Sequence, residues 1–221
     1  MNFDNTLIYR KNSIWFISDT HFGHDNILKF EKGYHNFANI KEHDIEIIAN
    51  WNAVVDPDDT VFFLGDFTMP KVNIKYVKSI LAQLPGKIVW IYGNHDLVST
   101  DDDLRKEFSK LANIVEFTNY KEILVEVKES ANSKYKKSNL KPVKLFHYPI
   151  AEFSGMFKGH YHFYGHTHEK VYTIKNAYSV STCLHNYSLV NFDTLDKKIK
   201  EINGSNRLRE FDIRRVEGNT W

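Results

Sequence analysis

The sequence predicts an α/β fold, because short apolar segments alternate with segments of helical periodicity in its first half. Residues 13–18, 60–64 and 87–92 have the apolar and aromatic character of buried strands, and 41–55 and 71–84 have helical spacing. This β-α-β-α-β order is typical of parallel strands joined by crossover helices. Strand patterns continue in the second half, so we expect the sheet structure to extend beyond this unit.

The helical segments are predicted from apolar residues that recur every three or four positions. Pro85-Gly86 ends the second of these segments, since neither residue continues a helix well. The apolar residues expected on the inner faces are Ile45, Ile48, Trp51 and Val55 in the first helix, and Ile74, Val77, Leu81 and Leu84 in the second.

The second half is predicted to contain mainly short strands. A helix is expected at 101–111 and a last one at 193–202; the strands are expected at 113–117, 123–127, 143–146, 161–164, 171–174 and 178–180. Residues 128–141 are rich in lysine, and we interpret them as an exposed hairpin loop, with a basic contact patch as the alternative. No repeat or linker divides the chain, so one domain over 1–221 is predicted.

Composition excludes several classes of protein. The 221 residues carry 29 Lys and Arg against 28 Asp and Glu, so the net charge of +1 provides no general basic field for nucleic acid. The single cysteine, Cys183, excludes an intramolecular disulfide and a cysteine-based zinc site. No apolar run is long enough to span a membrane, and the first residues do not resemble a signal peptide. We expect a cytoplasmic protein with no membrane partner; the sequence predicts no oligomeric state.

Polar clusters follow five of the predicted strands. They are Asp19-Thr20-His21, Gly65-Asp66, Gly93-Asn94-His95-Asp96, His147-Tyr148-Pro149 and Gly165-His166-Thr167-His168. Because ligands bind at the carboxyl ends of strands in α/β sheets, these clusters are expected to converge. Each cluster alone could be a turn or a packed polar group, but turns alone rarely produce all five, each directly after an apolar strand.

The clusters contain the nitrogen and oxygen ligands that divalent ions use, without a thiolate. A single ion needs three or four protein ligands, so seven candidates suit two ions that share one carboxylate. The candidate ligands are Asp19, His21, Asp66, Asn94, His147, His166 and His168.

The motif series resembles the calcineurin-like metallophosphoesterase superfamily, and in particular its small single-domain bacterial and phage members. This resemblance implies a four-layer sandwich, in which a central β-sandwich is flanked by helices. It also implies a water activated by two metal ions as the nucleophile. The ligand sets that it implies are Asp19, His21 and His168 for one ion, Asn94, His147 and His166 for the other, and Asp66 as the bridge.

The resemblance assigns His95 to the scissile phosphate rather than to a metal, as a group that stabilises charge or protonates the leaving oxygen. Two further catalytic candidates are His24, which lies in the same loop as His21, and Asp96, which is adjacent to His95 and could orient it. In the protein-phosphatase branch an acidic residue and an arginine stand where this chain has Met69 and Pro70, which argues against a protein phosphatase. His162 is a candidate for orienting a ligand, whereas His35, His43 and His185 are expected to be surface or packing residues.

We therefore predict a dimetal-dependent phosphoesterase that hydrolyses phosphodiester or small phosphomonoester bonds. Manganese is the expected metal, with Fe²⁺, Zn²⁺ or Ni²⁺ as alternatives. One alternative function is a metal-dependent nuclease acting on DNA or RNA, so that a nucleotide or nucleic acid would be the partner; a non-catalytic scaffold is another. Residues 22–42, 97–103 and 151–158 are expected to shape the pocket.

Overall fold

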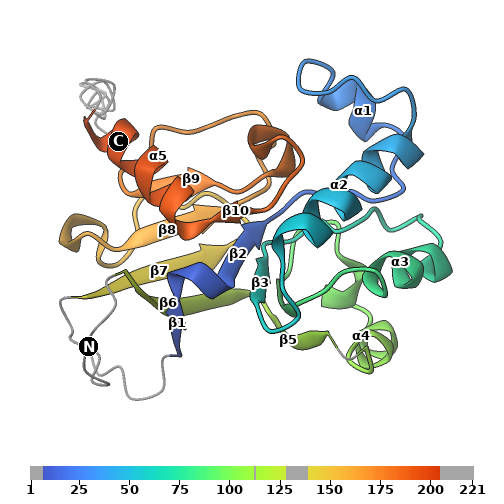
Figure 1. The fold of residues 1–221 in the computed structure, drawn as a ribbon, viewed down its shortest axis with the longest axis horizontal. Coiled ribbons are helices and arrows are strands. Elements are labelled where there is room, and N and C mark those ends of the chain that lie inside the picture. Colours follow the sequence, from blue (N-terminus) through green and yellow to red (C-terminus); the bar gives the residue numbers. More distant parts are fainter. Residues whose placement is uncertain (1–6, 112, 128–138, 205–221) are drawn as a thin grey trace, which may run out of the picture.

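Two five-stranded sheets packed face to face form the centre of the molecule (Figure 1). The structure is a computed structural model that describes residues 7–111, 113–127 and 139–204. The strand order is β10-β2-β3-β4-β5 in the first sheet and β1-β6-β7-β8-β9 in the second. The prediction of an α/β fold with parallel strands is confirmed.

The first sheet contains the predicted β-α-β-α-β unit. Strands β2 (Ile14–Ile17), β3 (Thr60–Phe63), β4 (Lys87–Ile91) and β5 (Ile114–Thr118) run parallel to one another. Strand β10 (Val190–Asn191) pairs with β2 in the antiparallel direction at the edge of the sheet. The carboxyl ends of β2, β3 and β4 therefore lie side by side.

The second sheet mixes parallel and antiparallel pairs. Strands β7 (Leu140–Phe146), β8 (Tyr161–Tyr164) and β9 (Ala177–Ser179) are parallel. Strand β6 (Tyr120–Glu126) pairs with β7 in the antiparallel direction, and β1 (Ile8–Arg10) pairs parallel to β6. The parallel pair β7 and β8 brings a second set of carboxyl ends together.

Helices flank the two sheets. The helices are α1 (Ile27–Phe30), α2 (Ile40–Val54), α3 (Ile74–Leu81), α4 (Asp102–Phe108) and α5 (Phe192–Gly204). Short 3-10 helices are η1 (Lys11–Ser13), η2 (Leu97–Ser99), η4 (Met156–Lys158) and η5 (Thr182–His185). Helices α2, α3 and α4 pack on the outer face of the first sheet, and α5 packs beside β9 and β10 (Figure 1).

The first sheet is buried on both faces, so its strands contribute to two apolar cores. In β3, Phe62 points into the core between the sheets, and its neighbours Val61 and Phe63 point toward the helices. Trp51 of α2 and Leu81 of α3 complete the helical side. Burial on both faces explains why these strands appear in the sequence as continuous apolar runs rather than as alternating ones.

Two predictions about local structure are wrong. Residues 171–174 form no strand, because the free edge of β8 pairs with β9 instead, and Val171 and Tyr172 are exposed. Ile45 is 64% exposed, because α2 buries His43, Asp44, Ile47 and Trp51.

Two further predictions concern the lysine-rich loop and the domain. Most of the loop predicted at 128–141 lies outside the described residues, which exclude 128–138, and the last two residues of the predicted loop belong to β7. The single domain over 1–221 stays a prediction.

No helix among the described residues has the length and apolar character needed to cross a lipid bilayer. The expected cytoplasmic location stays a prediction.

His162 of β8 is a buried histidine that holds the turn after β7. Its Nδ1 lies 3.2 Å from the carbonyl of Lys144, and its Nε2 lies 3.2 Å from both the amide of Ile150 and the carbonyl of Tyr148. Burial lowers the pKa of His162 to about 4, because the charged ring would lose its hydration.

We predict that acid destabilises the wild-type chain more than the His162→Gln variant. The unfolded chain takes up the proton near pH 6.5, but the folded chain resists it down to about pH 4. The stability that neutral His162 contributes is therefore present above pH 6.5 and is lost as the pH falls toward 4, by about 3 kcal/mol. Urea unfolding of both metal-free proteins between pH 7 and 4 measures this difference, with His35→Gln as the control. Parallel stability curves for wild type and His162→Gln would contradict the prediction.

Candidate metal centre

Loops from both sheets meet through backbone hydrogen bonds at the carboxyl ends of the strands. The amide of Asp19 donates to the carbonyl of Gly65 at 2.9 Å, and the amide of Gly165 donates to the carbonyl of His147 at 2.8 Å. The amide of His166 donates to the Asp19 carboxylate at 2.9 Å and so joins the two sheets. Four of the five predicted clusters are thus directly connected.

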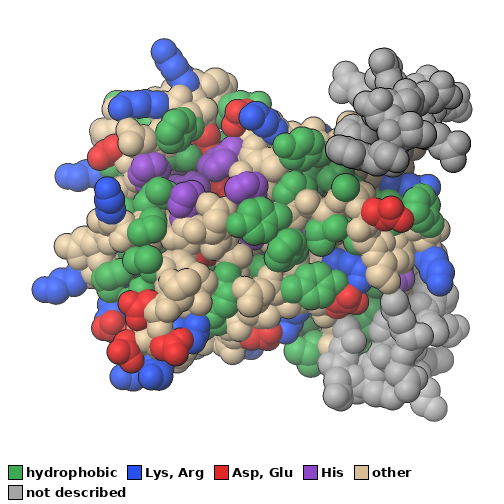
Figure 2. Space-filling model, turned by 180° about the vertical axis from the view of Figure 1, so that it is seen from behind, with side chains coloured by type: hydrophobic (Ala, Val, Ile, Leu, Met, Phe, Trp, Pro, Cys, Tyr) green, Lys and Arg blue, Asp and Glu red, His purple; other side chains and the backbone are tan. Residues whose placement is uncertain are grey.

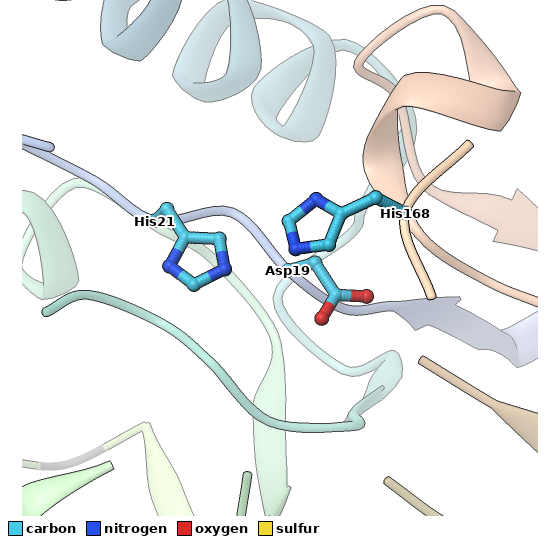
Figure 3. Close-up of side chains that lie close together, drawn as sticks. All are labelled: Asp19, His21 and His168. Atoms are coloured by element: carbon cyan, nitrogen blue, oxygen red, sulfur yellow. The ribbon is translucent and has the colours of Figure 1, made fainter. Parts of the chain in front are cut away.

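The first group of candidate ligands comprises Asp19, His21 and His168, which surround a common space (Figure 3). One potential ligand atom from each lies within 4.8 Å of the others. Asp19 is fully buried, and hydroxyl groups of Ser18 and Ser181 donate to its Oδ2 at 2.6 and 2.5 Å. These bonds fix the carboxylate at the centre of the group.

The second group comprises Asp66, His147 and His166, whose potential ligand atoms also lie within 4.8 Å of one another. The Nδ1 of His147 donates to the carbonyl of Leu64 at 2.7 Å, which directs Nε2 into the group. The Oδ1 of Asn94 lies 3.0 Å from His147 Nε2 and 2.8 Å from His166 Nδ1. Asn94 therefore lies in contact with both histidines of this group.

Asp66 lies between the two groups. Its Oδ2 is 3.7 Å from Nε2 of His21 in the first group and 3.4 Å from Nε2 of His147 in the second. Its Oδ1 accepts from the amide of His95 at 2.9 Å. This position is the one expected for a carboxylate shared by two ions.

Burial and charge act differently on the histidines of the two groups. Burial lowers the pKa of His21 to about 3, so its ring is neutral and can offer a lone pair to a metal. Burial also opposes charge on His147, but its contacts with Asp66 and the charge of Asp19 raise its pKa to about 9. The pKa of Asp66 is lowered to about 2, because His147 and His21 outweigh the effect of burial. Metal ligation at His147 would release a proton.

Left-handed backbone is concentrated at this centre. Five candidate ligands have positive φ angles: Asp19 (57°), His21 (42°), Asp66 (60°), His166 (69°) and His168 (48°). Such conformations cost on the order of 1–3 kcal/mol each and persist only where the surroundings hold them. Gly93 leaves the necessary room, since a Cβ on it would lie 2.2 Å from Oδ1 of Asp66.

The donor set fits divalent ions. Carboxylate, amide and imidazole groups suit Mn²⁺, Fe²⁺ and Zn²⁺, and Asp66 of the second group also lies 3.7 Å from Nε2 of His21 in the first. The buried Nδ1 of His21 has no hydrogen-bond partner among the described residues. A buried polar atom without a partner is costly, and an ion bound directly to this nitrogen would satisfy it.

An open cleft of about 540 Å³ gives access to the centre. Histidines gather in one patch of the surface, with hydrophobic side chains around them (Figure 2). His95 and His24 both line the cleft, so the structure places these two catalytic candidates beside the metal groups. The ring of His95 lies 5.6 Å from that of His21, and that of His24 lies 6.0 Å from it.

Asp96, which the sequence suggests as the partner of His95, points elsewhere. Its buried carboxylate accepts from the amides of Asp66, Phe67 and Gly93 and from the indole of Trp90, at 2.8 to 3.0 Å. None of these four bonds involves the His95 ring. Burial and the Asp66 charge raise the pKa of Asp96. The structure therefore makes Asp96 a residue that joins two loops rather than one that orients His95.

The cleft walls differ in part from the prediction. Residues of segment 22–42 line the cleft as expected, but no residue of 97–103 or 151–158 does. Residues 166–170 and Tyr172 line the cleft in place of these two segments. His162 contacts the turn after His147 rather than a ligand ring. The three histidines expected to be surface or packing residues bond away from the centre: His35 to Leu28, His43 to Asp44 and His185 to Ser179.

Two buried carboxylates near the centre were not found from the sequence. Glu31 accepts from Nδ1 of His168 at 2.6 Å, and Asp44 of α2 accepts from the amide of Gly23 at 2.9 Å. Asp44 also accepts from the Tyr76 hydroxyl at 2.5 Å. The only sequence signal for Asp44 is its place three residues before Ile47, on the face of α2 that is buried.

A family model described as the calcineurin-like phosphoesterase superfamily domain matches residues 13–191, which include all the candidate ligands. The chain belongs to this superfamily. Members of this superfamily hydrolyse phosphoester bonds with two metal ions, and the two ligand groups of this chain agree with a centre of that kind. The predicted family fold, two sheets flanked by helices, is confirmed.

Several relatives are similar to the chain. An uncharacterized protein, MJ1445 of Methanocaldococcus jannaschii, is 37% identical over 53% of this chain and 60% of its own length. The Gene 66 protein of Mycobacterium phage L5 is 34% identical over 37% of this chain and 39% of its own length. The chain thus spans less than two-thirds of the curated relatives that it matches. A solved structure, the protein of unknown function AQ665 from Aquifex aeolicus, covers 84% of this chain and 98% of its own, with 25% identity and a TM-score of 0.60.

We predict that Asp96→Asn destabilises the chain by about 3 kcal/mol. The backbone N–H groups that donate to Asp96 lose a charged acceptor, and the NH₂ group of asparagine is a donor that cannot accept from them. Chemical unfolding of the metal-free protein measures the loss. Asp103→Asn is the control: its side chain is 96% exposed and should change stability by no more than about 0.5 kcal/mol. Equal stability of the two variants would show that the Asp96 bonds do not hold the loops.

Proposed function

We propose that this chain hydrolyses phosphodiesters at the centre formed by the two ligand groups. The observation that carries the proposal is Asp66, whose carboxylate lies between His21 of the first ligand group and His147 of the second, beside an open cleft that other members of both groups line. Asp19, His21 and His168 would hold one ion, and Asn94, His147 and His166 the other. When bound, the two ions would lower the pKa of a water and neutralise phosphate charge.

The protein groups around this centre supply positioning and proton transfer. His95 is half-buried at the cleft, and the bond from its amide to Asp66 fixes its backbone beside the proposed bridge. We assign it to the phosphate, where it stabilises charge and protonates the leaving oxygen. His24 faces the same cleft, and burial, with the nearby His95, lowers its pKa, so it can act as a neutral donor to a phosphate oxygen.

Two adjoining clefts favour a diester over a monoester. The cleft over the metal groups shares His24 and Met69 with a second cleft of about 490 Å³. Phe30 and Tyr172 line the first cleft, whereas Lys41 and Lys71 line the second. A phosphodiester has two substituents, and each cleft would hold one of them, whereas a monoester would leave one cleft without an occupant.

The exposed aromatic side chains favour a nuclease as the second candidate. Phe30 is 69% exposed and Tyr172 43% exposed at the cleft, and such rings stack on nucleobases. The lysine-rich segment on which this hypothesis also rests lies largely outside the described residues. Steeply salt-dependent binding of short DNA or RNA strands would support a nuclease, and binding that does not change with salt would oppose it.

We predict that the protein with added Mn²⁺ hydrolyses bis-p-nitrophenyl phosphate with a higher kcat/KM than p-nitrophenyl phosphate. A chelator should abolish turnover, and fresh Mn²⁺ should restore it. A metal-loaded protein that hydrolyses neither compound, nor a panel of nucleotides and oligonucleotides, would refute the proposed function. Preference for the monoester would refute the two-cleft argument alone.

A second prediction concerns His95. His95→Asn should lower kcat about 10²- to 10⁴-fold, as expected for loss of an acid–base group. Its metal content should stay at the wild-type value, because His95 is assigned to the phosphate. Steady-state kinetics and metal analysis test both statements, with His35→Gln as the matched control. Loss of metal from His95→Asn would instead place the ring among the ligands.

A further inference from the structure

Glu31 is a buried carboxylate in contact with the first ligand group. It directly follows α1 and is 1% exposed. Its Oε1 accepts from Nδ1 of His168 at 2.6 Å, and its Oε2 accepts from the Tyr187 hydroxyl at 2.8 Å. Both carboxylate oxygens are thus engaged, and one of them holds a candidate metal ligand from a position 137 residues away in the chain.

This bond determines which nitrogen of His168 can bind an ion. A carboxylate only accepts, so Nδ1 of His168 carries a hydrogen and Nε2 is left for the metal. Figure 3 shows one ring nitrogen of His168 facing the space shared with Asp19 and His21, and the other pointing away. A carboxylate behind a histidine ligand also makes that ligand more basic.

The partner of Glu31 is held firmly in turn. Tyr187 is 3% exposed, and its ring packs edge-on against Phe37 at 4.9 Å and His43 at 5.4 Å. Rotation of the Glu31 carboxylate would therefore break its hydrogen bond to a hydroxyl that is itself held in place. The carboxylate is preorganised for the orientation of His168 that the first group requires.

Glu31 also connects this ligand to a wall of the cleft. Ile27 and Phe30 of α1 both line the cleft, and the amide of Glu31 donates to the carbonyl of Ile27 at 3.0 Å. The same residue thus contacts a candidate ligand through its side chain and the cleft wall through its backbone. The position of α1 and the orientation of His168 depend on each other.

We propose that Glu31 is a positioning residue of the first metal ion, which fixes His168 with Nε2 toward the ion and anchors α1 at the cleft. The inference rests on the proposed metal role of His168. Asp44 and Asp96, two other buried carboxylates near the centre that are not candidate ligands, lack this arrangement: Asp44 contacts loop and helix, and Asp96 contacts backbone amides and an indole. Glu31 alone of these three bonds a candidate ligand ring.

The test measures metal binding rather than turnover. Calorimetric titration of the chelator-treated full chain with Mn²⁺ should show two ions bound by wild type. In Glu31→Ala, one of the two should bind about 10- to 100-fold more weakly. Glu31→Gln keeps an acceptor and loses the charge, so its loss should be smaller, as should that of Tyr187→Phe.

Asp196→Asn is the matched control, because Asp196 accepts from the Tyr161 hydroxyl at 2.7 Å but lies on α5. It should bind both ions as wild type does. If Glu31→Ala does not fold, Glu31→Gln decides, since it preserves shape. Wild-type affinity for both ions in the folded Glu31 variants would overturn the inference.

An NMR measurement tests the orientation of His168 directly. In the Zn²⁺-loaded wild type, the Nδ1 proton of His168 should be visible and protected from exchange, and His168→Gln assigns its signal. The signal should disappear in Glu31→Ala, and its persistence there would overturn the inference.

A wild-type chain that binds no divalent ion would overturn both this inference and the proposed function. A chain that binds two ions, shows the Glu31 effect and hydrolyses no phosphoester would support this inference and refute only the function.

Discussion

One buried carboxylate, that of Asp96, holds the loops after β3 and β4 in contact, and the metal groups depend on that contact. Its oxygens accept from the amides of Asp66 and Phe67 in one loop and of Gly93 in the other. The loops approach so closely that a side chain on Gly93 would overlap Asp66. Asp66 is therefore held from both sides, and this is what places its carboxylate between the two groups.

The left-handed backbone at the centre has to be stabilised by the rest of the fold. The backbone strain at five candidate ligands would be relieved by opening of the loops if the loops were attached to mobile segments. They come soon after β2, β3 and β8, whose fully buried residues include Phe16, Phe63 and Phe163, so the apolar cores resist that opening. The ligands can thus be arranged before an ion binds, which reduces the ordering cost of binding.

The sequence predicts those parts of the fold and site that depend on neighbours in the chain. Strands β2, β3 and β4 appear as apolar runs, and the ligands are placed at their ends because parallel strands share an edge. Glu31 could not be predicted, since its partner His168 lies 137 residues away and no local pattern marks it. Strand β10 has two residues and is too short to show the alternating pattern of a strand. The exposed residues Val171 and Tyr172 led to the prediction of a strand, because apolar character alone does not show whether a segment pairs with a neighbouring strand.

Three buried carboxylates that are not candidate ligands each fix a different part of the site. Asp96 joins two loops, Asp44 holds the turn at Gly23, and Glu31 holds the ring of His168. Burying a carboxylate is costly unless donors satisfy it, and each of these accepts from at least two donors. The side chains of Phe30 and Tyr172 on the cleft wall, in contrast, are exposed and take no part in these bonds. Substitutions on that wall can therefore change which substituent the cleft accepts while the geometry of the ligands is preserved.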